Sequence, residues 1–363
     1  MKIGIITFHA SHNYGSVLQA YALQKYLSKL GYENEIINFR SEAQKEVYRP
    51  LTKRKGIKYI LKNAFFLLHY KSRKERYDKF EAFIEKRMNK SEKEYTSIDS
   101  LKNEEFSYDV FISGSDQIWN TAPADASMAY FLPFVKEGKR VAYAPSFGQL
   151  GTMEKADEIS SYLCKYDRLS IREKYGQQLI FELTGKKVPI LVDPTVLLLP
   201  DEWNSLEDRK PIINSRYIFF YTLFADKEMI KMVKAVSKIL GLPVVVSNIT
   251  NQHDIVSGFR RIISSGPEDF LNLIKNAEFV CTSSFHGTVF SLLYHKLFIS
   301  IRGMSDNRIS TLLECSGLTS RAINSIDELL SYEELMNIDY TGVNTAFDKK
   351  REEAKDYLLS AFQ

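Results

Sequence analysis

The N-terminal segment alternates between apolar runs and a helical pattern, and this alternation constrains the fold more than any other feature. Residues 2–7 form an apolar run, residues 16–30 repeat apolar side chains at helical spacing, and residues 33–39 are a second candidate strand. Gly31 directly follows the helical pattern, which is typical of a helix C-terminus. A strand, a helix and a strand in this order predict a βαβ unit, and hence a parallel sheet covered by helices.

The alternation continues along the chain and predicts two domains of the same class. Further strands are predicted at 108–113, 140–144, 168–171, 188–192, 216–222, 244–246, 260–263, 278–281 and 297–301. In the second half, helices are predicted at 226–240, from Pro267, from about His286, and at 308–316 and 326–336. We expect an α/β protein with two Rossmann-like, doubly wound domains that face each other across a cleft, with ligands at the carboxyl ends of the strands.

The polar segment 202–215 is typical of a linker and sets the predicted domain boundary. The N-terminal domain is predicted to cover residues 1–205, including a basic helical insertion at about 41–100, and the C-terminal domain residues 206–345. The final residues, 346–363, form an amphipathic helix that we expect to cross back onto the first domain.

Composition excludes several classes of protein. With 44% hydrophobic and 26% charged residues the chain is typical of a globular protein, and its net charge of +4 is too small to indicate nucleic acid as a partner. Cys164, Cys281 and Cys315 show neither metal-ligand nor disulfide spacing, which favours a reducing compartment. The chain shows no signal-peptide pattern and no apolar run of about 18 residues, so we expect a cytoplasmic protein.

Positive charge is concentrated between Arg49 and Lys90, where Lys and Arg surround the apolar run 65–68. Two interpretations of this segment stay open. It could contact an anionic membrane surface or polymer, which would place the protein at the inner face of the membrane. Alternatively, it is a solvated face of helices that pack through the apolar run.

Polar residues that directly follow predicted strands are the candidates for a functional site. Segment 9–16, His-Ala-Ser-His-Asn-Tyr-Gly-Ser, joins the first strand to the first helix, where free backbone amides favour an anion. It lacks the glycine patterns of dinucleotide-binding and nucleotide-binding loops. The alternatives are a turn capped by Ser16 and a metal site at His9 and His12, for which no nearby carboxylate supplies a further ligand.

Segment 113–120, Ser-Gly-Ser-Asp-Gln-Ile-Trp-Asn, follows another predicted strand. Gly114 lets the backbone approach a ligand, Asp116 can accept or position a proton, and Trp119 can stack on a sugar ring. The structural alternative is a helix cap at the aspartate and a tryptophan in the core.

Segments 143–148 and 170–173 also follow predicted strands, and the second contains Arg172. The neighbours of Arg172 look buried, so its charge must be compensated. Arg172 therefore either pairs with Glu173 or another acid, or holds an anionic ligand in its guanidinium fork.

Segment 281–288, Cys-Thr-Ser-Ser-Phe-His-Gly-Thr, is the most distinctive candidate. Its hydroxyl-rich turn places His286 at a helix N-terminus beside Gly287, which combines amide donors for a phosphate or carboxylate with a titratable imidazole. The structural alternative is a capping or packed histidine. Arg302 after the next strand and Arg308 at the next helix could add positive charge, or serve packing alone.

In their order along the chain, these segments resemble the polysaccharide pyruvyl transferase family. The matching segments are 13–21, 114–120, 143–148, 170–173, 192–195 and 283–287, and the resemblance covers roughly residues 1–320. It implies two Rossmann-like domains arranged as in glycosyltransferases of the B type, with phosphoenolpyruvate as donor and no cofactor. The implied acceptor is a sugar of a surface polysaccharide or of its lipid-linked precursor.

The resemblance also implies roles for single residues. His286 matches a family histidine of donor binding or catalysis, and Arg172 matches an arginine expected to hold the donor. Some members carry an arginine just before the histidine, where this chain has Ser284 and Phe285. Arg172 or one of two later arginines, Arg302 and Arg308, would then supply the charge.

We therefore predict a pyruvyl transferase that forms a ketal, with the acceptor on the N-terminal domain and the donor on the C-terminal domain. His286 and Asp116 are the predicted catalytic residues. The predicted donor contacts are Arg172, Arg308, Ser284, Gly287 and Thr288, and the predicted acceptor contacts are Gly114, Ser115, Gln117, Trp119, Asn13 and Tyr14. No metal is expected, and Arg172 and His286 would hold one donor across the cleft.

Two alternatives stay open. A glycosyltransferase with a nucleotide-sugar donor would use the same kind of two-domain cleft, because a fold does not determine a function. A sugar-binding or membrane-docking module built around the basic insertion would need no catalysis at all.

Overall fold

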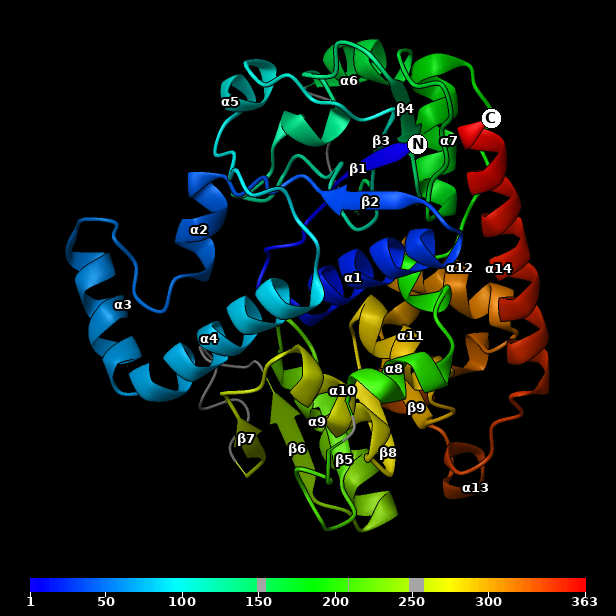
Figure 1. The fold of residues 1–363 in the computed structure, drawn as a ribbon. Coiled ribbons are helices and arrows are strands. Elements are labelled where there is room, and N and C mark those ends of the chain that lie inside the picture. Colours follow the sequence, from blue (N-terminus) through cyan, green and yellow to red (C-terminus); the bar gives the residue numbers. More distant parts are fainter. Residues whose placement is uncertain (149–154, 208, 248–257) are drawn as a thin grey trace. The chain divides into compact units, whose positions relative to one another are not determined.

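The structure is a computed structural model, and it divides into two compact units. The described residues are 1–148, 155–207, 209–247 and 258–363. The first unit comprises Met1–Leu198 together with Lys350–Gln363, and the second comprises Leu199–Lys349. Each unit contains one parallel sheet accompanied by helices, so the α/β prediction is confirmed (Figure 1). Among the described residues, no helix is both long enough and apolar enough to span a membrane.

The sheet of the first unit has four parallel strands in the order β2-β1-β3-β4. Their bounds are β1 Lys2–Ile6, β2 Glu33–Ile36, β3 Val110–Ser113 and β4 Lys139–Ala142. In the central strand β1, Ile5 lies opposite Ile36 on one side and Ile112 on the other. Strands buried on both faces form continuous apolar runs, which is why the sequence reveals them.

Two predicted strands of this unit, 168–171 and 188–192, are wrong, because the chain makes isolated bridges there instead of ladders. Side-chain hydrogen bonds replace the ladder next to β4. The Ser170 hydroxyl donates to the carbonyl of Ala142 at 2.7 Å and accepts from the amide of Ala144 at 3.0 Å.

The helices between the strands of this unit include those of the predicted basic insertion. They are α1 Tyr14–Lys29, α2 Glu42–Tyr48, α3 Ile57–Leu67, α4 Tyr70–Arg87, α5 Ile98–Lys102, α6 Ala156–Leu163 and α7 Lys174–Thr184. α1 begins at Tyr14 rather than at Ser16, since the Asn13 side chain accepts from the Gly15 amide at 2.9 Å and caps the helix. α3 lies at the start of α4, away from the sheet (Figure 1).

The sheet of the second unit has parallel strands in the order β10-β9-β8-β5-β6-β7. Their bounds are β5 Ile218–Tyr221, β6 Val244–Ser247, β7 Arg260–Ile262, β8 Phe279–Thr282, β9 Leu297–Ile301 and β10 Ala322–Ile323. The helices of this unit are α8 Pro200–Leu206, α9 Lys227–Leu240, α10 Pro267–Lys275, α11 Phe285–Leu293, α12 Asn307–Ser316 and α13 Tyr332–Leu335.

Two predictions for the second half need correction. The predicted linker starts inside α8, because Pro200 suits the first helical position and the Glu202 carboxylate accepts from the Leu199 amide at 2.9 Å. The predicted helix 326–336 is reduced to a 3-10 turn and the short α13.

The last helix, α14 (Thr341–Phe362), ends in the first unit. The Tyr357 hydroxyl donates to the carbonyl of Ala142, at the end of β4, at 2.8 Å. The ring of Phe362 lies 4.8 Å from the ring of Tyr32. These contacts make the final turns of α14 part of the first core.

Candidate functional site

Both sheets contain a point at which the strand order reverses, and parallel sheets bind ligands at the carboxyl ends of the strands there. In the first unit this point lies between β1 and β3, which are followed by the loops leading to Ser16 and Asp116. In the second unit it lies between β5 and β8, which are followed by Thr222 and Ser283. Each unit therefore carries candidate residues at its own switch point.

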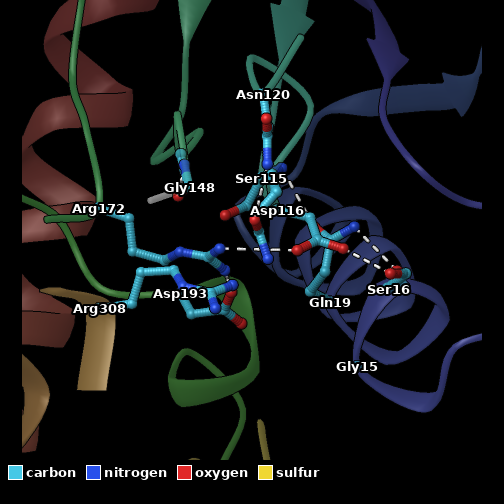
Figure 2. Close-up of polar contacts among 12 residues, drawn as sticks. Gly15, Ser16, Gln19, Ser115, Asp116, Asn120, Gly148, Arg172, Asp193 and Arg308 are labelled. Carbon is cyan, nitrogen blue, oxygen red and sulfur yellow. Dashed lines mark hydrogen bonds and ion pairs between the residues drawn. The ribbon is translucent and has the colours of Figure 1, made fainter. Parts of the chain in front are cut away.

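Asp116 is held in place from two sides. The Ser16 hydroxyl donates to Oδ2 of Asp116 at 2.5 Å, and Nη2 of Arg172 lies 3.6 Å from Oδ1 (Figure 2). The Asp116 carbonyl accepts from the Ser146 amide at 2.8 Å. A carboxylate oriented by a hydroxyl and a guanidinium at the end of a strand is suited to accept a proton from a bound hydroxyl.

Arg172 lies between two carboxylates, and neither is the Glu173 considered from the sequence. Nη1 of Arg172 donates to Oδ2 of Asp193 at 2.5 Å, and the Arg172 side chain is only 2% exposed. Oδ1 of Asp193 accepts from the amide and the hydroxyl of Thr195 at 3.0 and 2.6 Å. Arg172 thus belongs to a buried ion cluster, in which it orients Asp116.

Glu173 has a different function in this cluster. Its carboxylate accepts from the Ser146 hydroxyl at 3.0 Å and from the Phe147 amide at 3.2 Å. It therefore fixes the segment 143–148, which the sequence had singled out, beside the Asp116 loop.

Gly114 and Ser115 shape the backbone of this loop, and their prediction as acceptor contacts stays a prediction. Gly114 has a φ of 133°, and a Cβ atom there would lie 2.1 Å from the carbonyl oxygen of Tyr143. Ser115 is buried, its amide donates to the Gln19 side chain at 3.1 Å, and its hydroxyl donates to the Ala144 carbonyl. Both residues position the loop that carries Asp116.

Trp119 and Tyr14 lie in the core, as the structural alternative for Trp119 expected, and burial speaks against their predicted role as acceptor contacts. Trp119 is fully buried and stacks on Phe131, with 5.3 Å between ring centres. Tyr14 is fully buried and stacks on Phe80 at 5.5 Å. Since both side chains are fully buried, neither ring exposes a face on which a sugar could stack.

Asn13 and Gln117 are the half-buried residues of the predicted acceptor set. Asn13 is the N-cap of α1, which commits its side-chain oxygen. Oε1 of Gln117 accepts from the Asn120 side chain at 3.2 Å, and a Cβ atom at Gly148 would contact both amide groups. The Gln117 and Asn120 amides therefore border the Asp116 loop on its outer side.

A cavity of about 190 Å³ lies in the first unit next to the loop after β1. It is lined by Ala10, His12, Arg40, Gln44, Lys45, Tyr48, Arg49, Tyr77 and Glu94. Arg40 binds the Glu81 carboxylate through two hydrogen bonds of 3.0 and 2.6 Å, and Nε2 of His12 lies 2.7 Å from Glu81. Burial alone would raise the pKa of Glu81, but the contacts with His12 and Arg40 outweigh it and lower the pKa to about 2.

The two histidines of the first segment contact different partners. His12 contacts Glu81, whereas Nε2 of His9 lies 3.1 Å from the Asn38 side chain. Among the residues that the structure describes, no group of three or more His, Cys, Asp or Glu side chains is placed to hold a metal ion.

In the second unit, the turn between β8 and α11 presents hydroxyls and a histidine. The Thr222 and Ser283 hydroxyls are 2.6 Å apart, across the switch point. Ser284 caps α11, and His286 lies in the first turn of that helix with 6% of its surface exposed. The amides at the start of α11 and the His286 imidazole therefore lie at the carboxyl edge of the second sheet, which suits an anion.

Gly287 and Thr288 support this turn from inside, and their prediction as donor contacts stays a prediction. A Cβ atom at Gly287 would lie 2.2 Å from Oγ1 of Thr282, so glycine is needed for α11 to pack on β8. Thr288 is fully buried, and its hydroxyl contacts the Ser284 carbonyl at 3.1 Å and the Ser300 hydroxyl at 3.2 Å.

Arg308, and not Arg302, lies beside the residue that precedes His286. The Arg308 guanidinium is 5.8 Å from the centre of the Phe285 ring, and its Nε donates to Asp306 at 2.9 Å. Arg302 instead donates to Asp226 at 2.5 Å, at the start of α9. Arg308 therefore lies beside Phe285 and is paired with Asp306, and its role toward a donor stays a prediction.

Several residues of these two arrangements were missed in the sequence. Asp193 was visible as the Asp-Pro pair after an apolar run, but its partner could not be inferred. Ser16 was considered only as a cap, and Thr222 was taken as the last residue of a strand. In each case the sequence shows a polar residue near a strand end, but it does not show which distant residue that side chain contacts.

Comparison with known proteins gives a family and a fold. The sequence model of the polysaccharide pyruvyl transferase family matches residues 13–303. No curated protein matches the chain in a sequence search. The matched segment includes Asp116 in the first unit and Thr222, Ser283 and His286 in the second.

Solved structures agree on the fold. UDP-N-acetylglucosamine 2-epimerase from Rickettsia bellii is 7% identical, with a TM-score of 0.54 over 99% of this chain and 96% of that one. UDP-GlcNAc 2-epimerase from Neisseria meningitidis, bound to UDP-GlcNAc, is 10% identical, with a TM-score of 0.52 over 99% and 100% of the chains. At such low identity the likeness shows the fold alone, which is of the glycosyltransferase B type with two Rossmann-like domains.

Proposed function

The chain belongs to the polysaccharide pyruvyl transferase family, and from this premise we propose that it transfers pyruvate from phosphoenolpyruvate to a sugar. The proposed acceptor is a sugar of a surface polysaccharide or of its lipid-linked precursor, and the product is a pyruvyl ketal. The observation that carries the proposal is the turn at His286, which joins an imidazole, helix amides and the nearby Arg308 at one strand end. A small dianion such as phosphoenolpyruvate suits this combination.

The reaction needs an acid, a base and cations. A proton adds to the methylene carbon of phosphoenolpyruvate, and a sugar hydroxyl attacks C2, which has become electrophilic. The C2–O bond to phosphate then breaks, inorganic phosphate leaves, and a second sugar hydroxyl attacks C2 to close the ketal. The two hydroxyls release two protons: one balances the proton added to the methylene carbon, and the other is taken up by the departing phosphate.

We assign these tasks to residues of both units. Arg308 and the first amides of α11 bind the phosphate and carboxylate of the donor, and His286 transfers a proton or contacts the phosphate. Asp116 accepts the proton of an acceptor hydroxyl. Arg172 is a positioning residue in this proposal, because its side chain is only 2% exposed and is held between Asp193 and Asp116. Arg308 is also paired with a carboxylate, that of Asp306, but its side chain is 13% exposed.

The acceptor is assigned to the cavity beside the loop after β1. Its Tyr48 and Tyr77 rings could pack against a sugar ring, and its charged pairs offer donors and acceptors for hydroxyls. In this assignment the acceptor contacts the residues that line the cavity and not Tyr14 or Trp119, whose side chains are buried.

Substitution of His286 tests the proposal. We expect His286→Ala to lower phosphate release from phosphoenolpyruvate about 100- to 10,000-fold, measured with a panel of lipid-linked sugars, because a positioned acid or base is removed. His295→Ala is the matched control in the same unit, since His295 contacts Asn344 and stacks on Tyr340. Near-normal turnover of His286→Ala would show the catalytic assignment to be wrong.

Calorimetry separates this proposal from the nucleotide-sugar glycosyltransferase. We expect the protein to bind phosphoenolpyruvate, and Arg308→Met to weaken that binding. Binding of UDP or GDP without a response to phosphoenolpyruvate would favour the glycosyltransferase instead.

A further inference from the structure

Helix α3 presents an apolar face that the described residues of the chain leave uncovered. Five large side chains, each between 59% and 79% exposed, form this face: Ile57, Ile60, Leu61, Leu67 and Leu68. Residues at these spacings lie on one side of a helix. A contiguous exposed apolar patch of this kind marks an interaction site more often than scattered single side chains do.

The opposite side of α3 is fixed to its neighbours. The Arg73 guanidinium of α4 lies 3.6 Å from the centre of the buried Phe66 ring, and its Nε donates to the Pro50 carbonyl at 3.2 Å. Asn63 exchanges two hydrogen bonds with the backbone of Thr52, at 3.0 and 2.9 Å. The helix therefore has a defined inner side, and the exposed apolar face is its outer side.

The segment around this face carries only one sign of charge. Residues 47–74 contain nine Lys and Arg residues and no Asp or Glu, whereas the whole chain has 49 basic and 45 acidic residues. Exposed cations stand on both ends of α3, with Lys53, Arg54 and Lys55 before it and Lys71 after it. The apolar face is thus flanked by positive charge.

We propose that α3 docks the protein on an anionic membrane surface. The apolar face enters the boundary between headgroups and acyl chains, and the flanking cations contact the negative headgroups. Charge complementarity selects this occupant, because a second copy of the same face would bring two acid-free basic segments together. The inference concerns where the protein binds and does not depend on the proposed pyruvyl transfer.

Vesicle co-sedimentation of the full chain tests the docking. We expect binding to phosphatidylcholine vesicles that contain phosphatidylglycerol, weak binding to phosphatidylcholine alone, and release by salt. The triple variant Lys53→Gln, Arg54→Gln and Lys55→Gln should weaken binding to the anionic vesicles about 100-fold, since each cation near such a surface contributes about a fivefold factor. Its matched control replaces Lys231, Lys234 and Lys238, three exposed lysines of α9, by Gln and should bind normally.

The apolar contribution is tested separately. Ile60→Ser, Leu61→Ser and Leu68→Ser together should lower vesicle binding at least about 100-fold, because three large apolar side chains no longer enter the interface. Leu223→Ser with Phe224→Ser removes exposed apolar side chains from the second unit and should leave vesicle binding unchanged. Circular dichroism confirms that each variant remains folded.

Three outcomes would overturn the proposal. The full chain could fail to bind anionic vesicles, or the α3 variants could bind them as well as the α9 and Leu223/Phe224 controls do. The third outcome is a concentration-dependent dimer in gel filtration that the Ser substitutions in α3 abolish while vesicle binding persists. That result would assign the apolar face to a second copy of the chain.

Discussion

The two sheets carry polar groups at the same place, the carboxyl ends of two neighbouring strands, but hold them by different physical means. In the first unit, Asp116, Arg172 and Asp193 form a buried cluster of charges. In the second unit, Thr222 and Ser283 are neutral hydroxyls in contact with each other. The difference teaches that the first strand end depends on every member of an ion cluster, whereas the second depends on the backbone of a turn.

A buried charge that loses its partner is costly, so the first strand end should be the more fragile one. We expect Arg172→Met to lower the free energy of unfolding of the first unit by about 3–5 kcal/mol, because Asp193 and Asp116 lose their shared cation. The chain has two tryptophans, Trp119 in the first unit and Trp203 in the second. Urea unfolding followed by fluorescence in a Trp203→Phe background therefore reports on the first unit.

The matched control for Arg172 is an arginine at a strand end of the second unit. Arg302 also pairs with a carboxylate, but its side chain is 38% exposed. We expect Arg302→Met to cost at most about 1 kcal/mol, as is usual for a surface ion pair. Equal losses for Arg172→Met and Arg302→Met would contradict the contrast between the two strand ends.

Acid should also distinguish the two units. Burial lowers the pKa of His9 to about 4, outweighing its contacts with Asn38 and Thr7. The unfolded chain, with a pKa near 6.5, binds the proton first as the pH falls. The contribution of His9 to the free energy of unfolding is therefore fully present above about pH 6.5, and about 3 kcal/mol of it is lost as the pH falls to about 4.

Unfolding at about pH 7 and about pH 4 tests this in two single-tryptophan variants, Trp203→Phe for the first unit and Trp119→Phe for the second. The first unit, reported by Trp119, should lose more stability than the second unit, reported by Trp203. His9→Gln should reduce the pH dependence of the first unit alone. A first unit as stable at low pH as at neutral pH would show that His9 does not remain neutral in the folded state.

The sequence predicted the strands better than the contacts at their ends. The central strands β3, β5, β6 and β8 are short runs of buried residues, nearly all of them apolar, and parallel strands buried on both faces produce that signal directly, whereas the edge strands β2 and β7 are mostly polar. The segments 168–171 and 188–192 carry the same signal without forming ladders, because apolar composition reports burial and does not specify the hydrogen-bond partner. For 168–171 the local reason is Ser170, whose hydroxyl bonds the backbone of Ala142 and Ala144.

The candidate residues also divide into those that a local sequence signal identifies and those that depend on contacts between distant residues. His286 was predicted at a helix N-terminus and lies there, since the cap and the following apolar residues are local in sequence. The partners of Arg172 are distant in sequence, and nothing local indicates that Asp193 meets it. Trp119 shows a further limit, because a tryptophan near a strand end gives no local sign of whether its ring faces solvent or core.

The smallest effect is expected at the hydroxyl pair of the second unit. Thr222→Val keeps the shape of the side chain and removes a hydroxyl that contacts Ser283 and the carbonyl and amide of Phe224. It should cost about 0.5–1.5 kcal/mol for each hydrogen bond that water does not replace. Ser283→Ala should cost no more, because Ser283 is half-buried and water can reach its surroundings.

A double-mutant cycle measures how strongly these two hydroxyls are coupled. We expect a coupling free energy of about 0.5–1 kcal/mol between Thr222→Val and Ser283→Ala, from urea unfolding followed through Trp203 in a Trp119→Phe background. A coupling above about 2 kcal/mol would mean that the hydroxyls act as a buried unit comparable to the ion cluster of the first sheet. The two strand ends would then differ in their chemical groups and not in how strongly they are held.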